Sequence, residues 1–154
     1  MDLARIDLSP DQRPPSVARW VVATAASLAG SLLADAALVA IGEAVFPSTN
    51  GYGHFQFADY AKLTVIGVVV ACVAWPVVTV ITSSPRWVFF RMAVVVTVVL
   101  LLPDLYILVQ GQPVRAVAVL VVMHLAIALV TYNCLVRLAP TRPRRRAASG
   151  SPPA

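Results

Sequence analysis

Three ionisable side chains interrupt long apolar stretches of this sequence: Asp35, Asp104 and His124. Two carboxylates and an imidazole can pass protons between them or bind a ligand. A charged side chain at the centre of a membrane helix costs about 2.5 to 3.5 kcal/mol, so each of these groups needs a partner, water or neutralisation. If the three share one site, the chemistry that they indicate is proton binding or transfer.

No motif of a known catalytic class accompanies these residues. The sequence has no P-loop, nucleophile elbow, zinc-binding His-Glu motif or glycine-rich dinucleotide signature. Because neither a nucleophile nor a set of metal ligands is spaced for catalysis, we expect no enzyme activity, no cofactor and no bound metal.

The composition indicates which elements must hold the polar groups. Hydrophobic residues make up 59% of the chain and charged residues only 12%, well below the quarter or so that is usual in soluble domains. Apolar runs of about twenty residues can cross a hydrocarbon core of about 30 Å as helices, in which lipid forces the backbone to bond internally. We therefore predict an all-α membrane protein, a four-helix transmembrane bundle with spans at about residues 20–42, 63–81, 87–109 and 116–136.

The rest of the sequence divides into two tails and a loop. Residues 1–18 are polar with paired prolines, and residues 139–154 are basic and proline-rich, so both are predicted to be disordered tails. The transmembrane domain then comprises residues 19–138. Between the first two spans, aromatic residues around a glycine turn predict a compact loop at the outer membrane interface.

Basic residues are distributed unevenly about the predicted spans. Lys62 and Arg115 lie on one side, and the other side has ten: Arg5, Arg13, Arg19, Arg86, Arg91, Arg137, Arg142, Arg144, Arg145 and Arg146. The positive-inside rule therefore places both termini in the cytoplasm. Anionic lipids at the cytoplasmic face explain the net charge of +5, so we expect no nucleic-acid partner.

The first span has one face of small and hydroxyl residues. Ser27 and Ser31 precede Asp35 at intervals of four, and Gly30 and Ala34 follow the adjacent row. Such residues let membrane helices approach closely and hydrogen-bond across the contact. We expect this packing face to point into the bundle and to carry Asp35 with it.

Two arrangements of the polar groups remain open. By residue counting, Asp35 lies about 6 Å and Asp104 about 9 Å to the outer side of the span middle, with His124 near the midplane. Asp104 can form an ion pair with Arg115 at the outer rim, or it can point inwards to Asp35 and His124. A neutral His124 that donates a hydrogen bond to Asp35 or to a backbone carbonyl would have a structural role. In a proton relay or a ligand site, the same side chain would have a functional role.

The stretches "LLPDLYILVQGQP" and "VVMHLAIALV" resemble a group of small four-span actinobacterial membrane proteins of uncharacterised function. The residues that carry the resemblance are Pro103 and Asp104 in span three, and Met123 and His124 in span four. The resemblance implies a four-helix fold in a bacterial cell membrane, and it implies no activity.

Two classes of function fit the sequence. The favoured interpretation is a non-enzymatic accessory or structural component of a membrane assembly, which associates as a homo-oligomer or within a larger complex. The alternative is a small proton-coupled transporter or carrier, in which Asp35, Asp104 and His124 line an outward-facing polar cavity. Four helices are few to enclose a substrate pathway, so we expect a carrier to work as a dimer. If Asp35, Asp104 and His124 turn towards a shared water-sized cavity, the carrier gains support. If each pairs locally or faces a different direction, the carrier interpretation fails.

Overall fold

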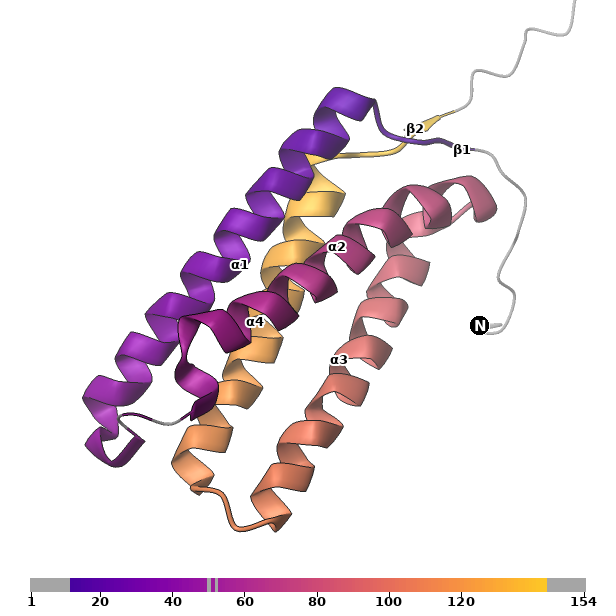
Figure 1. Cartoon of the computed structure of the whole chain (residues 1–154). Coiled ribbons are helices and arrows are strands. Elements are labelled where there is room, and N and C mark those ends of the chain that lie inside the picture. The colour runs from indigo at the N-terminus through magenta and orange to yellow at the C-terminus, as the bar shows by residue number, and fades with distance from the viewer. Residues whose placement is uncertain (1–11, 50, 52, 144–154) are drawn as a thin grey trace, which may run out of the picture.

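The computed structural model describes residues 12–49, 51 and 53–143, and long helices account for most of them (Figure 1). The helices are α1 (Val17–Val45), α2 (Phe57–Ile81), α3 (Pro85–Val109) and α4 (Val114–Leu138). All four are long and apolar enough to cross a membrane, which confirms the predicted helical architecture. Two short 3₁₀ helices, η1 (Pro47–Thr49) and η2 (Gly53–Phe55), lie in the loop between α1 and α2.

The helices extend beyond the apolar runs that predicted them. α1 begins at Val17 rather than near residue 20, and α2 begins at Phe57 rather than near residue 63. Hydropathy marks only the part of a helix that hydrocarbon covers, whereas the backbone hydrogen bonds continue until another feature ends them. After α3 that feature is Gly111, whose φ of 87° lies in the left-handed region that glycine adopts easily.

α4 makes the most extensive contacts in the bundle, because it packs closely along α1 and α3 and also touches α2. α1 lies antiparallel along one side of it and α3 along another, while α2 crosses the bundle diagonally (Figure 1). Both ends of the described chain lie at one end of the bundle, here called the terminal end, together with the turn at residues 82–84. The connections at residues 46–56 and 110–113 lie at the opposite end, here called the loop end.

Short segments that flank the bundle pair with each other at the terminal end. β1 (Gln12–Arg13) is antiparallel to β2 (Arg142–Pro143), with Gln12 opposite Pro143 and Arg13 opposite Arg142. Residues 12–13 and 142–143 belong to the tails predicted to be disordered, at residues 1–18 and 139–154, and the disorder of those tails stays a prediction. The rest of that prediction, at residues 1–11 and 144–154, lies outside the described residues.

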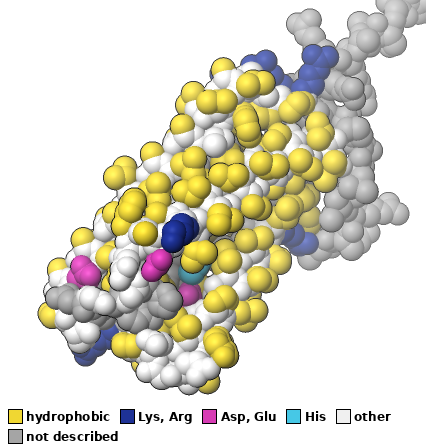
Figure 2. Space-filling view, in the orientation of Figure 1, with side chains coloured by type: hydrophobic (Ala, Val, Ile, Leu, Met, Phe, Trp, Pro, Cys, Tyr) yellow, Lys and Arg dark blue, Asp and Glu magenta, His cyan; other side chains and the backbone are white. Residues whose placement is uncertain are grey.

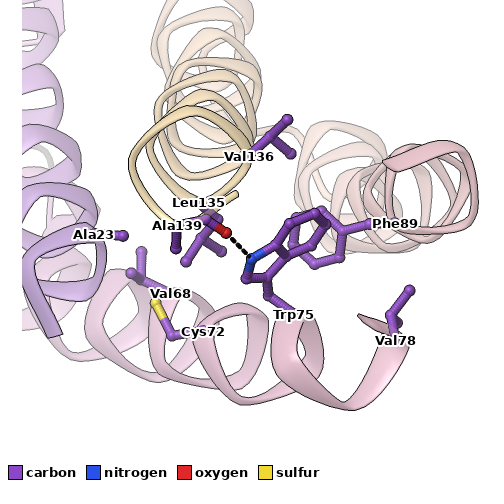
Figure 3. Close-up of a cluster of buried hydrophobic side chains, with 9 residues drawn as sticks. All are labelled: Ala23, Val68, Cys72, Trp75, Val78, Phe89, Leu135, Val136 and Ala139. Carbon is purple, nitrogen blue, oxygen red and sulfur yellow. Dashed lines mark hydrogen bonds between the residues drawn. The ribbon is translucent and has the colours of Figure 1, made fainter. Parts of the chain in front are cut away.

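A cluster of buried apolar side chains fills the terminal half of the bundle (Figure 3). Trp75 of α2 is fully buried, and its indole N–H donates to the carbonyl of Ala139, just past α4, at 2.9 Å. Phe89 of α3 packs edge-on against the indole, with 5.0 Å between ring centres. One tryptophan thereby joins the ends of α2, α3 and α4. The other members of the cluster are Ala23, Val68, Cys72, Val78, Leu135 and Val136.

Pro76 gives the same region a second tryptophan contact. Proline has no N–H, so the carbonyl of Cys72, one turn earlier, loses its partner within α2. The indole N–H of Trp20 on α1 donates to that carbonyl at 2.8 Å. The proline inside the helix therefore creates an attachment point for α1.

α3 is the helix with the least cover from the rest of the chain. Its buried residues are Pro85, Phe89 and Asp104. Apolar side chains dominate the face of the molecule shown in Figure 2. A continuous apolar surface of this kind is unfavourable in water, so it is a surface for lipid or for other membrane helices.

Candidate functional site

One face of α1 carries the first predicted polar group into the bundle. Ser27, Ser31 and Asp35 are fully buried, because residues four apart lie on one face of a helix. Ser27 Oγ donates to a carbonyl of its own helix at 2.8 Å, and Ser31 Oγ lies 3.4 Å from Thr131 Oγ1 of α4. Ala34, on the adjacent row, is half-buried. The packing face expected on this helix thus lies inside the bundle, against α4.

Two glycines of α1 determine how closely it approaches α4. A Cβ atom added to Gly30 would lie 2.9 Å from Val130 Cγ1, and one added to Gly42 would lie 2.9 Å from Val119 Cγ2. Distances this short require the neighbouring side chain to move, so the helices are in close contact at both points. The two contacts lie on either side of Asp35 along α1, and they hold it close to α4.

Asp35 is bonded to α2. Its Oδ2 accepts a hydrogen bond of 2.6 Å from Thr64 Oγ1. Tyr60, one turn earlier on α2, interacts with the same carboxyl group electrostatically. Within the described part of the chain, Oδ1 of Asp35 has no hydrogen-bond partner. A buried carboxylate oxygen of this kind is an acceptor to which a proton or a donor group can still bind.

Asp104 and His124 form the second part of the cluster. Nδ1 of His124 lies 2.9 Å from Asp104 Oδ2 and 3.0 Å from the carbonyl oxygen of Leu120. The Leu120 carbonyl can only accept, so Nδ1 carries a proton and donates it to that carbonyl, beside the carboxylate of Asp104. The side chain of Asp104 is 7% exposed and that of His124 is 26% exposed. The imidazole is therefore the member of the pair that reaches the surface.

His124 connects the two parts of the cluster. Asp104 contacts the imidazole directly, whereas Asp35 lies only within electrostatic range of it. With Thr64 included, each of the four helices contributes a side chain. We call Asp35, Thr64, Asp104 and His124 the polar cluster. The three ionisable groups that the sequence singled out thus lie together in the fold.

The polar cluster lies in the loop-end half of the bundle. Counted at about 1.5 Å per residue, its members lie about 3 to 10 Å from the middle of their helices, on the side of the loop end. Figure 2 shows a histidine side chain next to acidic and apolar side chains in this half of the visible face. Within the described ranges, no group of three or more His, Cys, Asp or Glu side chains is arranged to hold a metal ion.

Arg115 lies apart from the polar cluster. Its guanidinium carbon is 5.4 Å from the centre of the Phe46 ring. Of the two arrangements left open by the sequence, the structure has Asp104 in contact with His124 and not the ion pair with Arg115. Helical side chains lean towards the N-terminus of their helix, so Arg115 points to the loop end, whereas His124 reaches back one turn towards Asp104.

Thr64 is a member of the cluster that sequence analysis missed. A threonine neither carries charge nor interrupts an apolar run, so hydropathy does not mark it. The signal that could have found it is its position, one turn after Tyr60 and one turn before Val68, which are both buried. A hydroxyl in the buried stripe of an otherwise uncharged span indicates a contact between helices.

The helices and the polar cluster together define a class of protein. Four helices that are long and apolar enough to cross a membrane, with ionisable groups turned inwards, form the architecture of a multi-pass membrane protein. Residues 10–141 match the model of a family described as a family of unknown function, DUF6069, and the chain belongs to that family. This match agrees with the resemblance to four-span proteins of uncharacterised function. No curated protein and no solved structure matches the chain.

Proposed function

We propose that this chain is a proton-coupled carrier, in which Asp35, Asp104 and His124 bind and pass protons. The observation that supports the proposal is their convergence. His124 lies 2.9 Å from Asp104, and the buried Asp35 lies within electrostatic range of the imidazole, although the three come from different helices. The sequence alone favoured an accessory role, because it left the rotation of the helices open. Two local contacts count for the accessory role instead, because Asp35 bonds to Thr64 and Asp104 contacts His124.

Charge counting explains why the polar cluster should take up protons. With both carboxyl groups ionised and the imidazole neutral, it holds two negative charges among buried residues. A proton on His124 removes one of these charges and turns its contact with Asp104 into a full ion pair. The unpartnered Oδ1 of Asp35 offers a second acceptor. The partly exposed imidazole is where a proton would enter.

The distribution of basic residues supports an orientation for this carrier. Six of the described basic residues belong to the terminal end, namely Arg13, Arg19, Arg86, Arg91, Arg137 and Arg142, whereas Lys62 and Arg115 belong to the loop end. By the positive-inside rule the terminal end faces the cytoplasm, and the polar cluster lies nearer the outer surface. Together with the arginine-rich composition, the resemblance described above supports an actinobacterial cell membrane as its location.

Proton flux into vesicles tests the proposal. The full chain is reconstituted into liposomes that contain a pH-sensitive dye, and a potassium gradient with valinomycin drives protons inwards. We expect acidification above that of protein-free liposomes, and a loss of most of it in Asp35→Asn and Asp104→Asn. Asp59→Asn is the matched control, because Asp59 is exposed and pairs with Lys62 outside the cluster. Flux equal to that of protein-free liposomes would contradict the proposal.

The exposure of α3 favours a second candidate, the accessory or structural role. Apart from Pro85, Phe89 and Asp104, its residues are not buried, so most of this helix is available to another membrane helix. For this role, Asp35→Asn and Asp104→Asn should lower the amount of folded protein without any effect on proton flux. Gentle detergent extraction followed by native mass spectrometry would then detect a second copy or a larger complex.

A further inference from the structure

We infer that the terminal half of α3 binds one anionic phospholipid, with Arg91 against the phosphate and an acyl chain along the helix. A shallow groove of about 390 Å³ lies on this part of α3. The residues that line it are Trp87, Val88, Arg91, Met92, Val95 and Val96. They form two adjacent rows with a step of four, so the groove follows the helix axis.

The groove has one charged residue in an otherwise apolar lining. The guanidinium carbon of Arg91 lies 3.8 Å from the centre of the Trp87 ring, and this contact fixes its position at the start of the groove. Beyond it, Met92, Val95 and Val96 extend the groove for about 8 Å towards the middle of the helix. A charged head followed by an apolar track matches the shape and chemistry of a phospholipid.

The charge of Arg91 has no counterpart nearby in the described part of the chain. The contacts between carboxylates and basic side chains seen there involve other residues, namely Asp59 with Lys62 and Asp104 with His124. The described acidic residues, Asp35, Glu43, Asp59 and Asp104, all belong to the loop-end halves of their helices or to the start of α2. A guanidinium this far inside an apolar helix attracts an anion from its surroundings, and at a membrane surface that anion is a lipid phosphate.

The groove distinguishes a lipid from a free anion. Inorganic phosphate could satisfy Arg91, but it would leave the apolar lining beyond Arg91 uncovered. An acyl chain covers the exposed surface of Val95 and Val96, which are 61% and 53% exposed. Trp87 at the head of the groove is also typical of the level at which lipid head groups meet hydrocarbon.

Native mass spectrometry of the full chain in neutral detergent tests this inference. Phosphatidylglycerol and phosphatidylcholine with identical acyl chains are added at equal concentrations. We expect one molecule of phosphatidylglycerol to be retained in about five-fold preference, the effect of one arginine on an anionic lipid. Arg91→Gln should abolish the preference. Arg137→Gln is the matched control, because Arg137 is an exposed arginine at the same end of the bundle, and it should retain the preference.

Two further arms separate the sources of the phosphate group. Val95→Trp fills the groove and leaves Arg91 in place, so it should reduce lipid retention, and inorganic phosphate should not displace the lipid. Displacement by phosphate together with normal retention by Val95→Trp would show an anion site without a lipid. Equal losses in Arg91→Gln and Arg137→Gln would show diffuse surface attraction. Either result, or equal retention of the two lipids, would overturn the inference.

Discussion

Replacing Gly42 with alanine tests whether close packing of α1 on α4 supports the polar cluster. The new Cβ would lie 2.9 and 3.2 Å from the two methyl carbons of Val119, which cannot rotate freely because valine is restricted at χ1. Overpacking of this kind costs about 1 to 3 kcal/mol. Alanine also favours the helix over glycine by about 1 kcal/mol. The net loss of stability, about 0 to 2 kcal/mol, therefore needs a control for helix propensity.

Gly67 of α2 provides that control. A Cβ added to Gly67 would meet no atom within 4 Å, so Gly67→Ala changes helix propensity without a clash. The free energy of unfolding is measured for both variants by titrating SDS into mixed micelles. We expect Gly42→Ala to be less stable than Gly67→Ala by about 1 to 3 kcal/mol. Adding Val119→Ala to Gly42→Ala should recover part of the difference. Equal stabilities of the two single variants would refute the close packing.

Three further experiments test two other contacts and the orientation in the membrane. Thr64→Val removes the hydroxyl that donates to Asp35 and should cost about 1 to 3 kcal/mol of unfolding free energy. The control is Thr97→Val, because the hydroxyl of Thr97 donates within its own helix, and this change should lower the unfolding free energy by less than about 1 kcal/mol. Equal losses of unfolding free energy in the two variants would contradict the role of Thr64. Trp75→Phe keeps an aromatic ring but loses the bond to the end of α4, so its unfolding free energy should fall by about 1 kcal/mol or more. In a variant without native cysteines, an impermeant maleimide on intact cells should label Ser48→Cys but not Thr141→Cys, and the opposite pattern would reverse the proposed orientation.

The helices and the burial of Asp35 could be predicted because single-chain properties determine them. An apolar run of sufficient length has to form a helix in lipid, since every backbone group must bond within the chain. The spacing of Ser27, Ser31 and Asp35 then marks one face of α1, because the surrounding positions are apolar. The structure places those three side chains inside the bundle at zero exposure.

The partner of Asp104 could not be predicted because it depends on how two helices are rotated. α3 and α4 are apolar on nearly every side, so hydrophobicity does not specify which face meets a neighbour. Residue counting brought Arg115 within reach of Asp104 but ignored the direction of its side chain. The lean of helical side chains towards the N-terminus favours His124 instead. Thr64 was missed for a related reason, because a neutral hydroxyl becomes informative only once Asp35 is opposite it.

α3 is attached to the bundle in two physically different ways. Near the terminal end, Phe89 packs against Trp75 and Tyr132, with ring centres 5.0 and 5.9 Å apart. Towards the loop end, its buried side chain is Asp104, which pairs with His124. Apolar packing does not respond to protons, whereas the strength of an ion pair depends on whether the imidazole is charged.

Proton binding should therefore alter the attachment of α3 at the loop end alone. A carrier requires a coupling of this kind, in which the position of a helix depends on whether a proton is bound. Asp104→Asn imitates the loss of this ion pair. It should increase amide hydrogen exchange at residues 100–109 and leave exchange at residues 85–92 unchanged, because the contact of Phe89 with Trp75 remains. Equal increases over both segments would show that α3 moves as one body. The Asp104–His124 pair would then stabilise the attachment of the whole helix and not that of its loop end alone.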